Sequence, residues 1–551
     1  MLLPIVLAVA GVVHAVSPEL LRLGPQGVNL WKLQRNQHQH SRRLLVQETS
    51  DFTLAEEFPA QWFEQPLDHF DDSIKDTFMQ RYWVNKRHYD PAVGGPVIVL
   101  DGGETSGEDR LPYLDTGIVE ILCNATGGVG VVLEHRYYGE SIATQNLTTD
   151  SLRFLNNDQA AADSAAFMSK VKFAGIDEDL TAPGTPWIYY GGSYAGARSA
   201  HMRILYPDIV FGAIASSAVT HAAITNWEYM DVIRKAADPT CSQHLENSIQ
   251  TIDAILAHDT PHGLLSKPLK ALFGVQGLKH DVDFVSLIES PLGSWQSKNW
   301  DPAVGSTAFD QFCKAINKPV RGHNFTAEGV DVTTLEFGHP DRLVDVGDGL
   351  TVDMSIVNYG TYIRNNVVSR CPTSNTLEEC FGTFNDSQYT NTSLSEDWRL
   401  WQFQVCTQWG YFTTAPPDPS YPRIISRLLD LEYESKICRQ AYPPGEFFTV
   451  PELPNITSVN VLGDFDAGRG LDRLAFIDGE VDPWRPDTPH SDYARPREDT
   501  IQRPFKLIPG AVHHWDENGL PGGVGEPPEI KQIHAEEVEF VKAWLKDFKK
   551  N

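Results

Sequence analysis

Short apolar runs alternate with helical patterns between about residues 60 and 220. Runs rich in β-branched or aromatic residues lie at 96–100, 129–133 and 187–190, and a further one lies at 210–217. Such runs are typical of strands that are buried on both faces. An Ala-rich helical pattern at 158–173 separates two of them. The alternation therefore predicts a βαβ series around a mostly parallel sheet.

The middle of the chain has a different pattern. The stretches 229–237 and 248–258 are compatible with helices, and β-branched runs become sparse. Strand patterns return at 473–477 and 503–508, and residues 530–549 carry apolar side chains at helical spacing. We therefore expect an α/β sheet domain in two parts, 51–220 and 436–551, split by a largely helical cap over 221–435.

The first residues resemble a targeting segment. Residues 1–15 are apolar but too short to span a bilayer, and they end in the small-residue pattern Val13-His14-Ala15. We interpret 1–15 as a secretory signal peptide, although it lacks a basic start; a buried strand or helix is the alternative. Residues 16–50 are polar and contain the dibasic pair Arg42-Arg43, so they are either a pro-segment or a flexible extension.

The composition narrows the function classes. A formal net charge of −28 and a lack of basic runs argue against nucleic-acid or electrostatic membrane partners. Seven cysteines allow three disulfides and one free thiol in an oxidising compartment, and no spacing suggests a metal or cofactor. Six Asn-x-Ser/Thr glycosylation sites fit a secreted protein, with the vacuole or lysosome as the alternative: Asn124, Asn146, Asn324, Asn385, Asn391 and Asn455.

Candidate chemistry centres on Ser193. The segment Trp187–Ala197 places this serine between glycines, after an apolar strand and before a helical pattern. This is the layout of a nucleophile elbow, in which a strained turn holds a serine at a helix N-terminus. Ala195 replaces the last glycine of the usual Gly-x-Ser-x-Gly spacing, and Gly196 follows it. A plain Gly-rich loop is the alternative.

A serine nucleophile needs a base and an acid that orients the base, and both are expected late in the chain. Asp482 follows one predicted strand, and the pair His513-His514 follows the next. Asp478 and Glu480 compete as the acid, with Asp478 preferred as a turn residue. Chemistry alone does not separate the two histidines.

An oxyanion hole needs backbone donors from two places. We expect the amide of Tyr194 and one amide of the loop after the first central strand, with Gly103 and Glu104 as candidates. A simple turn is the alternative for this loop, and Glu104 could instead bind a substrate amino terminus. Aromatic candidates for a substrate pocket, each of which core packing would also explain, are Trp398, Trp401, Trp409, Tyr411 and Trp484.

Several blocks carry a family resemblance. Phe63–Phe70, Phe78–Trp83 and Glu134–Ser141 resemble, in order, the N-terminal blocks of the lysosomal Pro-X carboxypeptidase family, and the Ser, Asp and His blocks follow. That family includes prolyl carboxypeptidase, dipeptidyl peptidase II, thymus-specific serine protease and fungal acid prolyl endopeptidases. The overall pattern is most similar to the fungal members.

The resemblance implies an α/β-hydrolase fold with an inserted helical cap, and peptide cleavage after proline that is commonly best in acid. It assigns Ser193 as nucleophile, Asp482 as acid and His513 as base. His69 and His135 each lie in a strand-like, aromatic-rich block, so we interpret both as structural. Two departures, Gln408 in place of Glu and the loop Gly102–Ser106, leave exopeptidase or endopeptidase action open.

Other functions stay in view. A carboxypeptidase of the carboxypeptidase Y type has a similar serine turn, but the blocks Phe63–Phe70 and Glu134–Ser141 argue against it. A lipase or esterase is another option, and a hydrolase fold used only for binding is opposed by the intact Ser, Asp and His set. Peptides or proteins are the expected substrates, and the oligomeric state is open, a homodimer included.

Overall fold

The computed structural model describes residues 18–45, 54–259, 263–319, 335–336, 343–346 and 350–549. The expected signal peptide (1–15) and the glycosylation site at Asn324 lie outside these residues. Within the described part, no helix has both the length and the apolar composition that crossing a bilayer requires.

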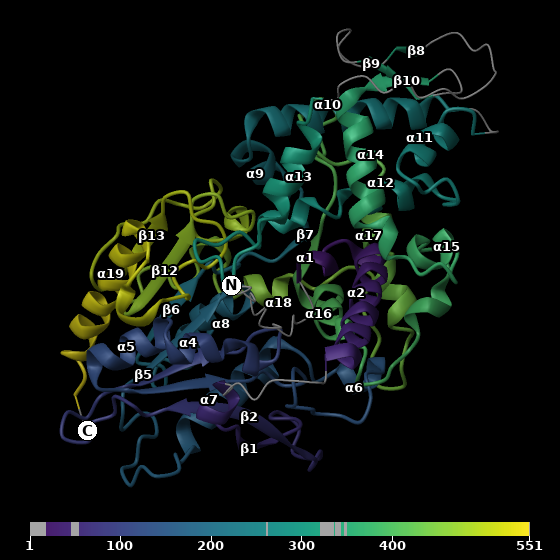
Figure 1. The fold of residues 1–551 in the computed structure, drawn as a ribbon. Helices are drawn as coiled ribbons and strands as arrows, with labels where there is room; N and C mark the ends of the chain where they lie inside the picture. Colours follow the sequence, from purple (N-terminus) through teal and green to yellow (C-terminus); the bar gives the residue numbers. More distant parts are fainter. Residues whose placement is uncertain are drawn as a thin grey trace, which may run out of the picture.

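A central sheet of eight strands organises the fold (Figure 1), in the order β1-β2-β4-β3-β5-β6-β12-β13. β2 is antiparallel to both neighbours, and the remaining pairs are parallel. The strands are β1 (Gln61–Pro66), β2 (Thr77–Asn85), β3 (Val97–Asp101), β4 (Val129–Leu133), β5 (Trp187–Gly192), β6 (Gly212–Ser216), β12 (Leu474–Gly479) and β13 (Phe505–Ile508). The molecule has the α/β-hydrolase fold, as the sequence predicts.

The strands feed hydrophobic cores on both faces of the sheet. Val97 and Val99 of β3 pack on one face with α7 (Asn157–Lys170) and α8 (Ser193–Leu205). Ile98 and Leu100 pack on the other with α5 (Ile118–Thr126) and α19 (Pro528–Leu545). Because side chains alternate along a strand, a run without polar residues can fill both cores. This explains why the buried strands were recognisable in the sequence.

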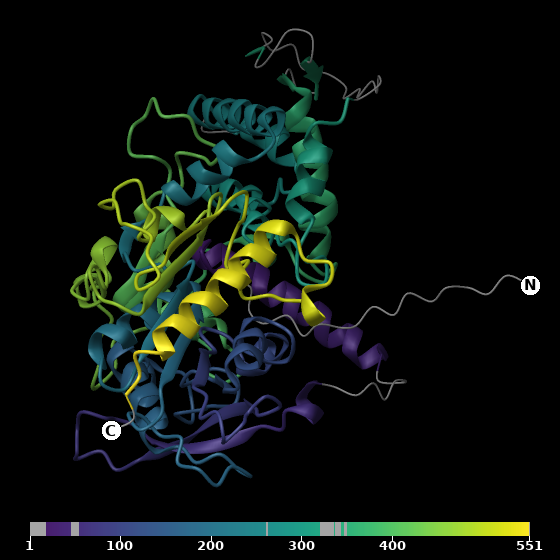
Figure 2. The same cartoon turned by 90° about the vertical axis from the view of Figure 1, so that its left-hand side faces the viewer.

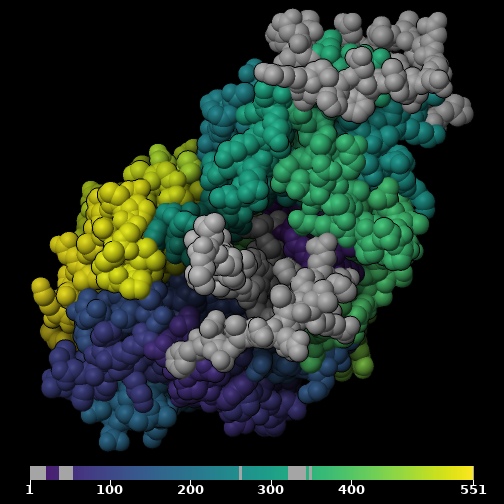
Figure 3. Space-filling view, in the orientation of Figure 1, coloured from purple at the N-terminus to yellow at the C-terminus, as the bar shows by residue number. Residues whose placement is uncertain are grey.

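The chain between β6 and β12 forms a mainly helical cap with a hydrophobic core of its own. The cap stands on the sheet domain (Figure 3), and short strands pair within it. Its longer helices are α9 (Glu228–Ala236), α10 (Pro239–Ala257), α11 (Ser266–Leu272), α12 (Asp281–Glu289), α13 (Ala308–Ile316), α14 (Met354–Asn366), α16 (Trp398–Gln404) and α17 (Leu431–Ala441). Its strands are β7 (Ala223–Thr225), β8 (Leu335–Glu336), β9 (Leu343–Asp345), β10 (Leu350–Asp353) and β11 (Gly410–Phe412).

Disulfides strengthen this inserted part. The three bonds join Cys241 to Cys313, Cys371 to Cys380 and Cys406 to Cys438, and all lie between β6 and β12. Cys123 is a free, buried cysteine in the sheet domain. Cross-links of this kind stabilise mainly by restricting the unfolded chain.

Most described glycosylation sites are open to solvent. The side chains of Asn124, Asn385, Asn391 and Asn455 are exposed, and Asn146 is partly buried. Asn124 lies in α5, and Asn146 caps a turn by accepting a hydrogen bond from the Thr148 amide at 3.1 Å.

The N-terminal segment forms two helices, α1 (Pro18–Leu21) and α2 (Gly24–Leu45), and packs against the cap (Figure 2). Leu23 and Leu30 belong to the cap core, and Trp31 belongs to a neighbouring core under α16 and α17. A flexible extension was one of the two expectations for 16–50, and this burial contradicts it for the first half of the segment. Burial of each large apolar side chain contributes about 1.5–3 kcal/mol to the free energy of folding. Because 16–50 is polar on average, its composition does not reveal these few apolar residues.

Truncating a buried side chain of α2 tests whether this segment supports the cap. Leu30→Ala leaves a cavity at a position that is 2% exposed, so we expect a loss of about 2–5 kcal/mol in unfolding free energy. Gln34→Ala, on the partly exposed side of the same helix, is the matched control and stays within about 0.5 kcal/mol. Thermal and chemical denaturation measure both, and equal stability of the two variants would contradict a supporting role.

Candidate active site

The turn between β5 and α8 places Ser193 at the start of the helix. Its φ angle is +59°, a strained conformation for a residue with a side chain. A Cβ at Gly191 would lie 2.3 Å from the carbonyl oxygen of Ala195, and one at Gly196 2.4 Å from that of Ser216. Only glycine fits at both places, which accounts for the Gly-rich sequence around this serine.

His513 and Asp482 meet at the ends of the last two strands. The Nδ1 atom of His513 lies 2.8 Å from Oδ2 of Asp482, and both residues are buried. Burial alone would raise the pKa of Asp482. The charge and hydrogen bond of His513 outweigh this effect and lower the pKa below its ordinary value, so the carboxylate stays ionised. With Nδ1 donating to Asp482, Nε2 is the basic nitrogen, and it has no hydrogen-bond partner within the described residues.

The competing residues have other partners. Asp478 lies inside β12, not in a turn as expected, and its carboxylate binds Nδ1 of His490 at 2.6 Å. Glu480 accepts a hydrogen bond from the Gly510 amide at 2.9 Å. His514 pairs with Glu517 at 3.0 Å. The geometry therefore pairs His513 with Asp482, which spacing alone could not decide.

The two expected oxyanion positions lie close together. Tyr194 is the second residue of α8, so its amide has no carbonyl acceptor inside the helix. A Cβ at Gly103 would lie 3.4 Å from the Cβ of Ala195, so the loop after β3 packs on the first turn of α8. The Gly103 amide donates to Asp101 Oδ1 at 3.0 Å and is not a free donor, contrary to expectation. The Glu104 amide is the other candidate in this loop, and it lies close to its own carboxyl group.

A cavity has Ser193, Tyr194 and Glu104 in its wall. Trp401, Tyr411 and Trp484 supply its aromatic lining, and Leu21 and Arg22 of the N-terminal segment close one side. Trp409 does not line the cavity; its ring packs edge-on against Tyr194 with centroids 5.2 Å apart. Trp398 lies in a separate core.

His135, for which the sequence predicts a structural role, contacts Tyr194, the residue after Ser193. Its Nε2 lies 3.0 Å from the Tyr194 hydroxyl, and its Nδ1 lies 2.8 Å from the carbonyl oxygen of Arg136. Burial and the charge of Arg198 lower the pKa of His135 to about 4. The Gln404 amide also donates to the Tyr194 hydroxyl, at 2.8 Å. The ring of Tyr194 is therefore held from two sides, next to the amide that is the oxyanion candidate.

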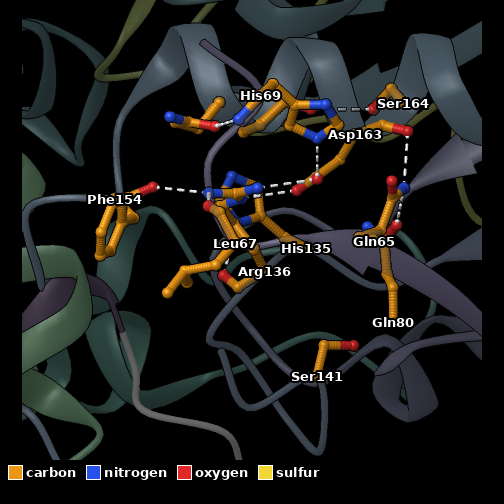
Figure 4. A network of polar contacts seen from close by, with 12 residues as sticks. Gln65, Leu67, His69, Gln80, His135, Arg136, Ser141, Phe154, Asp163 and Ser164 are labelled. Atoms are coloured by element: carbon orange, nitrogen blue, oxygen red, sulfur yellow. Dashed lines mark hydrogen bonds and ion pairs between the residues drawn. The ribbon is translucent and has the colours of Figure 1, made fainter. Parts of the chain in front are cut away.

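His69 belongs to a structural network (Figure 4) in the neighbouring part of the fold. Its Nε2 binds Asp163 at 2.7 Å, and the Arg136 guanidinium binds the same carboxylate at 2.6 and 2.8 Å. Arg136 also donates to the carbonyl oxygens of Leu67 and Phe154. These contacts tie the loop after β1 to α7, which fits the structural role expected for His69.

Comparison with known proteins places the chain in a family. The family model described as serine carboxypeptidase S28 matches residues 65–532. The chain belongs to this family. It is therefore a serine peptidase, and the resemblance drawn from the sequence blocks is confirmed.

Relatives of the S28 chain span most of its length. A protein of Arthroderma benhamiae named "Probable extracellular serine carboxypeptidase" is 39% identical over 524 residues, covering 92% of this chain and 70% of the relative. Serine protease vicPb of Bipolaris victoriae is 28% identical, covering 82% and 83%. The lysosomal Pro-X carboxypeptidase of Mus musculus is 26% identical, covering 93% and 94%.

Separate substitutions of the adjacent histidines test the pairing. We expect His513→Gln to lower kcat about 10⁴-fold or more, because the base that contacts Asp482 is removed. His514→Gln, the matched control, should lower kcat by roughly tenfold at most, because this ring faces Glu517. Steady-state hydrolysis of an activated ester measures both, and equal losses would contradict the assignment.

Proposed function

We propose that this chain is a secreted S28 peptidase that cleaves after proline through Ser193, His513 and Asp482. Two observations carry the proposal: the buried His513–Asp482 bond at the strand ends, and an elbow serine that lines an aromatic cavity. Glu104 lines the same cavity, and its carboxyl group interacts electrostatically with His513.

In this mechanism Ser193 Oγ attacks the carbonyl carbon of the scissile bond, and His513 Nε2 takes the hydroxyl proton. Asp482 holds the ring and stabilises the imidazolium. The amides of Tyr194 and Glu104 bind the oxyanion of the tetrahedral intermediate. His513 then gives its proton to the leaving amine, and an acyl-enzyme remains. Water then attacks the acyl-enzyme while His513 takes its proton. His513 returns this proton to Ser193, and the product is released with a new carboxyl group.

The aromatic walls support proline specificity. Trp401, Tyr411 and Trp484 line the cavity, and Tyr411 and Trp484 pack edge-to-face with their ring centroids 5.1 Å apart. A rigid pocket of this kind suits a pyrrolidine ring, which has no side-chain polar group to satisfy.

Removal of a C-terminal residue is the proposed mode of action. The names of two relatives, an extracellular serine carboxypeptidase and a Pro-X carboxypeptidase, support it. The same extracellular name, the glycosylation sites and the apolar residues 1–15 support secretion.

Covalent labelling tests the nucleophile. We expect a fluorophosphonate probe to label the wild-type protein, and Ser193→Ala to abolish labelling while the thermal transition is retained. Mass spectrometry of peptides ending in Pro-Xaa should then show loss of Xaa alone. Cleavage that does not depend on proline would contradict the proposed specificity. Internal cleavage would contradict the carboxypeptidase mode. A folded wild-type protein that the probe does not label would contradict the peptidase activity itself.

The environment of the Glu104 carboxyl group is an argument for activity in acid. Desolvation raises its pKa above the ordinary value, although Arg110 and His513 act in the opposite direction. Below the raised pKa the group is neutral, and above it a negative charge stands beside the proposed oxyanion site, where it opposes the transition state.

Replacing this carboxyl group separates the effect of its ionisation on activity from the effects of the other titrating groups. We expect the ratio of kcat/KM for Glu104→Gln to that of wild type to rise about tenfold as the pH rises through the pKa of Glu104. Profiles from pH 3 to 8 on one ester substrate measure the ratio. A ratio that stays constant with pH would show that Glu104 has no part in the acid preference.

A further inference from the structure

Asp101 ends β3 and belongs to none of the catalytic groups, yet three parts of the active site meet at its carboxylate. Oδ1 accepts the Gly103 amide at 3.0 Å. Oδ2 accepts the Tyr189 hydroxyl at 2.6 Å and Nε of Arg198 at 2.7 Å. The residue is 4% exposed, so water does not compete for these bonds.

The partners of Asp101 come from the two sides of the oxyanion hole. Tyr189 lies on β5 just before Ser193, and Arg198 lies on α8 just after it. Gly103 has a φ of +65° and is followed by Glu104, whose amide is the candidate donor in the loop. One carboxylate therefore joins the strand–turn–helix that carries Tyr194 to the loop that carries Glu104.

A further residue, Ser164, connects two of the partners of Asp101. Nη2 of Arg198 donates to the Ser164 hydroxyl at 3.2 Å, and Ser164 lies 2.9 Å from the Tyr189 hydroxyl. Burial would raise the pKa of Asp101, but Arg198, His135 and the hydrogen bonds lower it below its ordinary value. The charge therefore persists in acid, where the enzyme is proposed to work.

We propose that Asp101 is a positioning residue that sets the separation of the two oxyanion donors, the amides of Tyr194 and Glu104. The inference rests on the proposed role of Ser193 as nucleophile. Donors act only where charge develops, and a misplacement of about 1 Å can cost roughly 100-fold in rate. A hole assembled from two chain segments needs a link between them, and the Gly103–Asp101–Arg198 bonds provide it.

A purely structural ion pair would behave differently, and the chain offers a comparison. Asp163 and Arg136 form another buried pair (Figure 4), with side chains that are 1% and 0% exposed. Their described contacts lie with the segments around β1 and α7, and none of these contacts involves the Gly103–Glu104 loop or α8. Weakening this pair should lower stability and leave kcat unchanged.

Two double variants isolate the link to the loop. Asp101→Asn/Arg198→Leu and Asp101→Leu/Arg198→Leu both remove the buried charges together, which avoids an unpaired ion. Only the first keeps an oxygen that accepts the Gly103 amide and an NH₂ group that donates to Tyr189. We expect kcat to be about 10- to 100-fold lower in the second variant than in the first, with KM within about threefold.

An ester and its thionoester provide the decisive readout. Sulfur is a poorer and larger acceptor than oxygen, so an intact hole discriminates strongly against the thionoester. The ratio of kcat/KM for ester to that for thionoester should fall in Asp101→Leu/Arg198→Leu and stay near the wild-type value in Asp163→Asn. Equal ratios and equal kcat in the two double variants, both folded, would overturn the proposal.

A milder variant covers the case in which the double variants do not fold. Asp101→Glu keeps the charge beside Arg198 and shifts the acceptor by one methylene. Its ester-to-thionoester ratio should fall, and an unchanged ratio would overturn the proposal. Fluorophosphonate labelling of the wild type separates the two levels: no labelling refutes the nucleophile, whereas labelling with unchanged ratios refutes only the role of Asp101.

Discussion

The close approach of β5, α8 and β6 is the constraint on which the rest of the site depends. Ser193 adopts a positive φ only because Gly191 and Gly196 allow the backbone of the turn to touch its neighbours. The strain is held by packing on both faces of the sheet, where the apolar strands leave little freedom to relax. Tyr194 and its amide are placed by the same turn, so their position is coupled to that of Ser193.

The cap has a different physical basis. It has its own hydrophobic core and three disulfides, and the first half of α2 completes that core from a distant part of the chain. The cavity lies between this unit and the sheet domain: Trp401 and Tyr411 come from the cap, whereas Trp484 and Ser193 come from the sheet domain. The cavity therefore depends on two separately stabilised parts of the molecule.

Buried carboxyl groups around the His513 loop respond to pH in opposing ways. Burial raises the pKa of Asp516 to about 6, so its contribution favours the folded state in acid and is lost as the pH rises from its unfolded value to about 6. Asp482 and Glu517 have lowered pKa values, held down by histidine partners, and their contributions are lost as the pH falls. A fall in pH therefore changes the folding stability through these groups in two opposing directions.

Local patterns in the sequence determined the buried strands, the elbow around Ser193, the family blocks and the insertion of a helical cap, because each depends on neighbours along the chain. The pairing of His513 with Asp482, of His514 with Glu517 and of Asp478 with His490, and the hydrogen bond of the Gly103 amide, emerged only in three dimensions. So did the disulfide pairs, the buried N-terminal helix, the position of Trp409 away from the cavity and the contacts of Asp101. These features join residues far apart in sequence, and their geometry follows from how the sheet and cap pack, which no local spacing encodes.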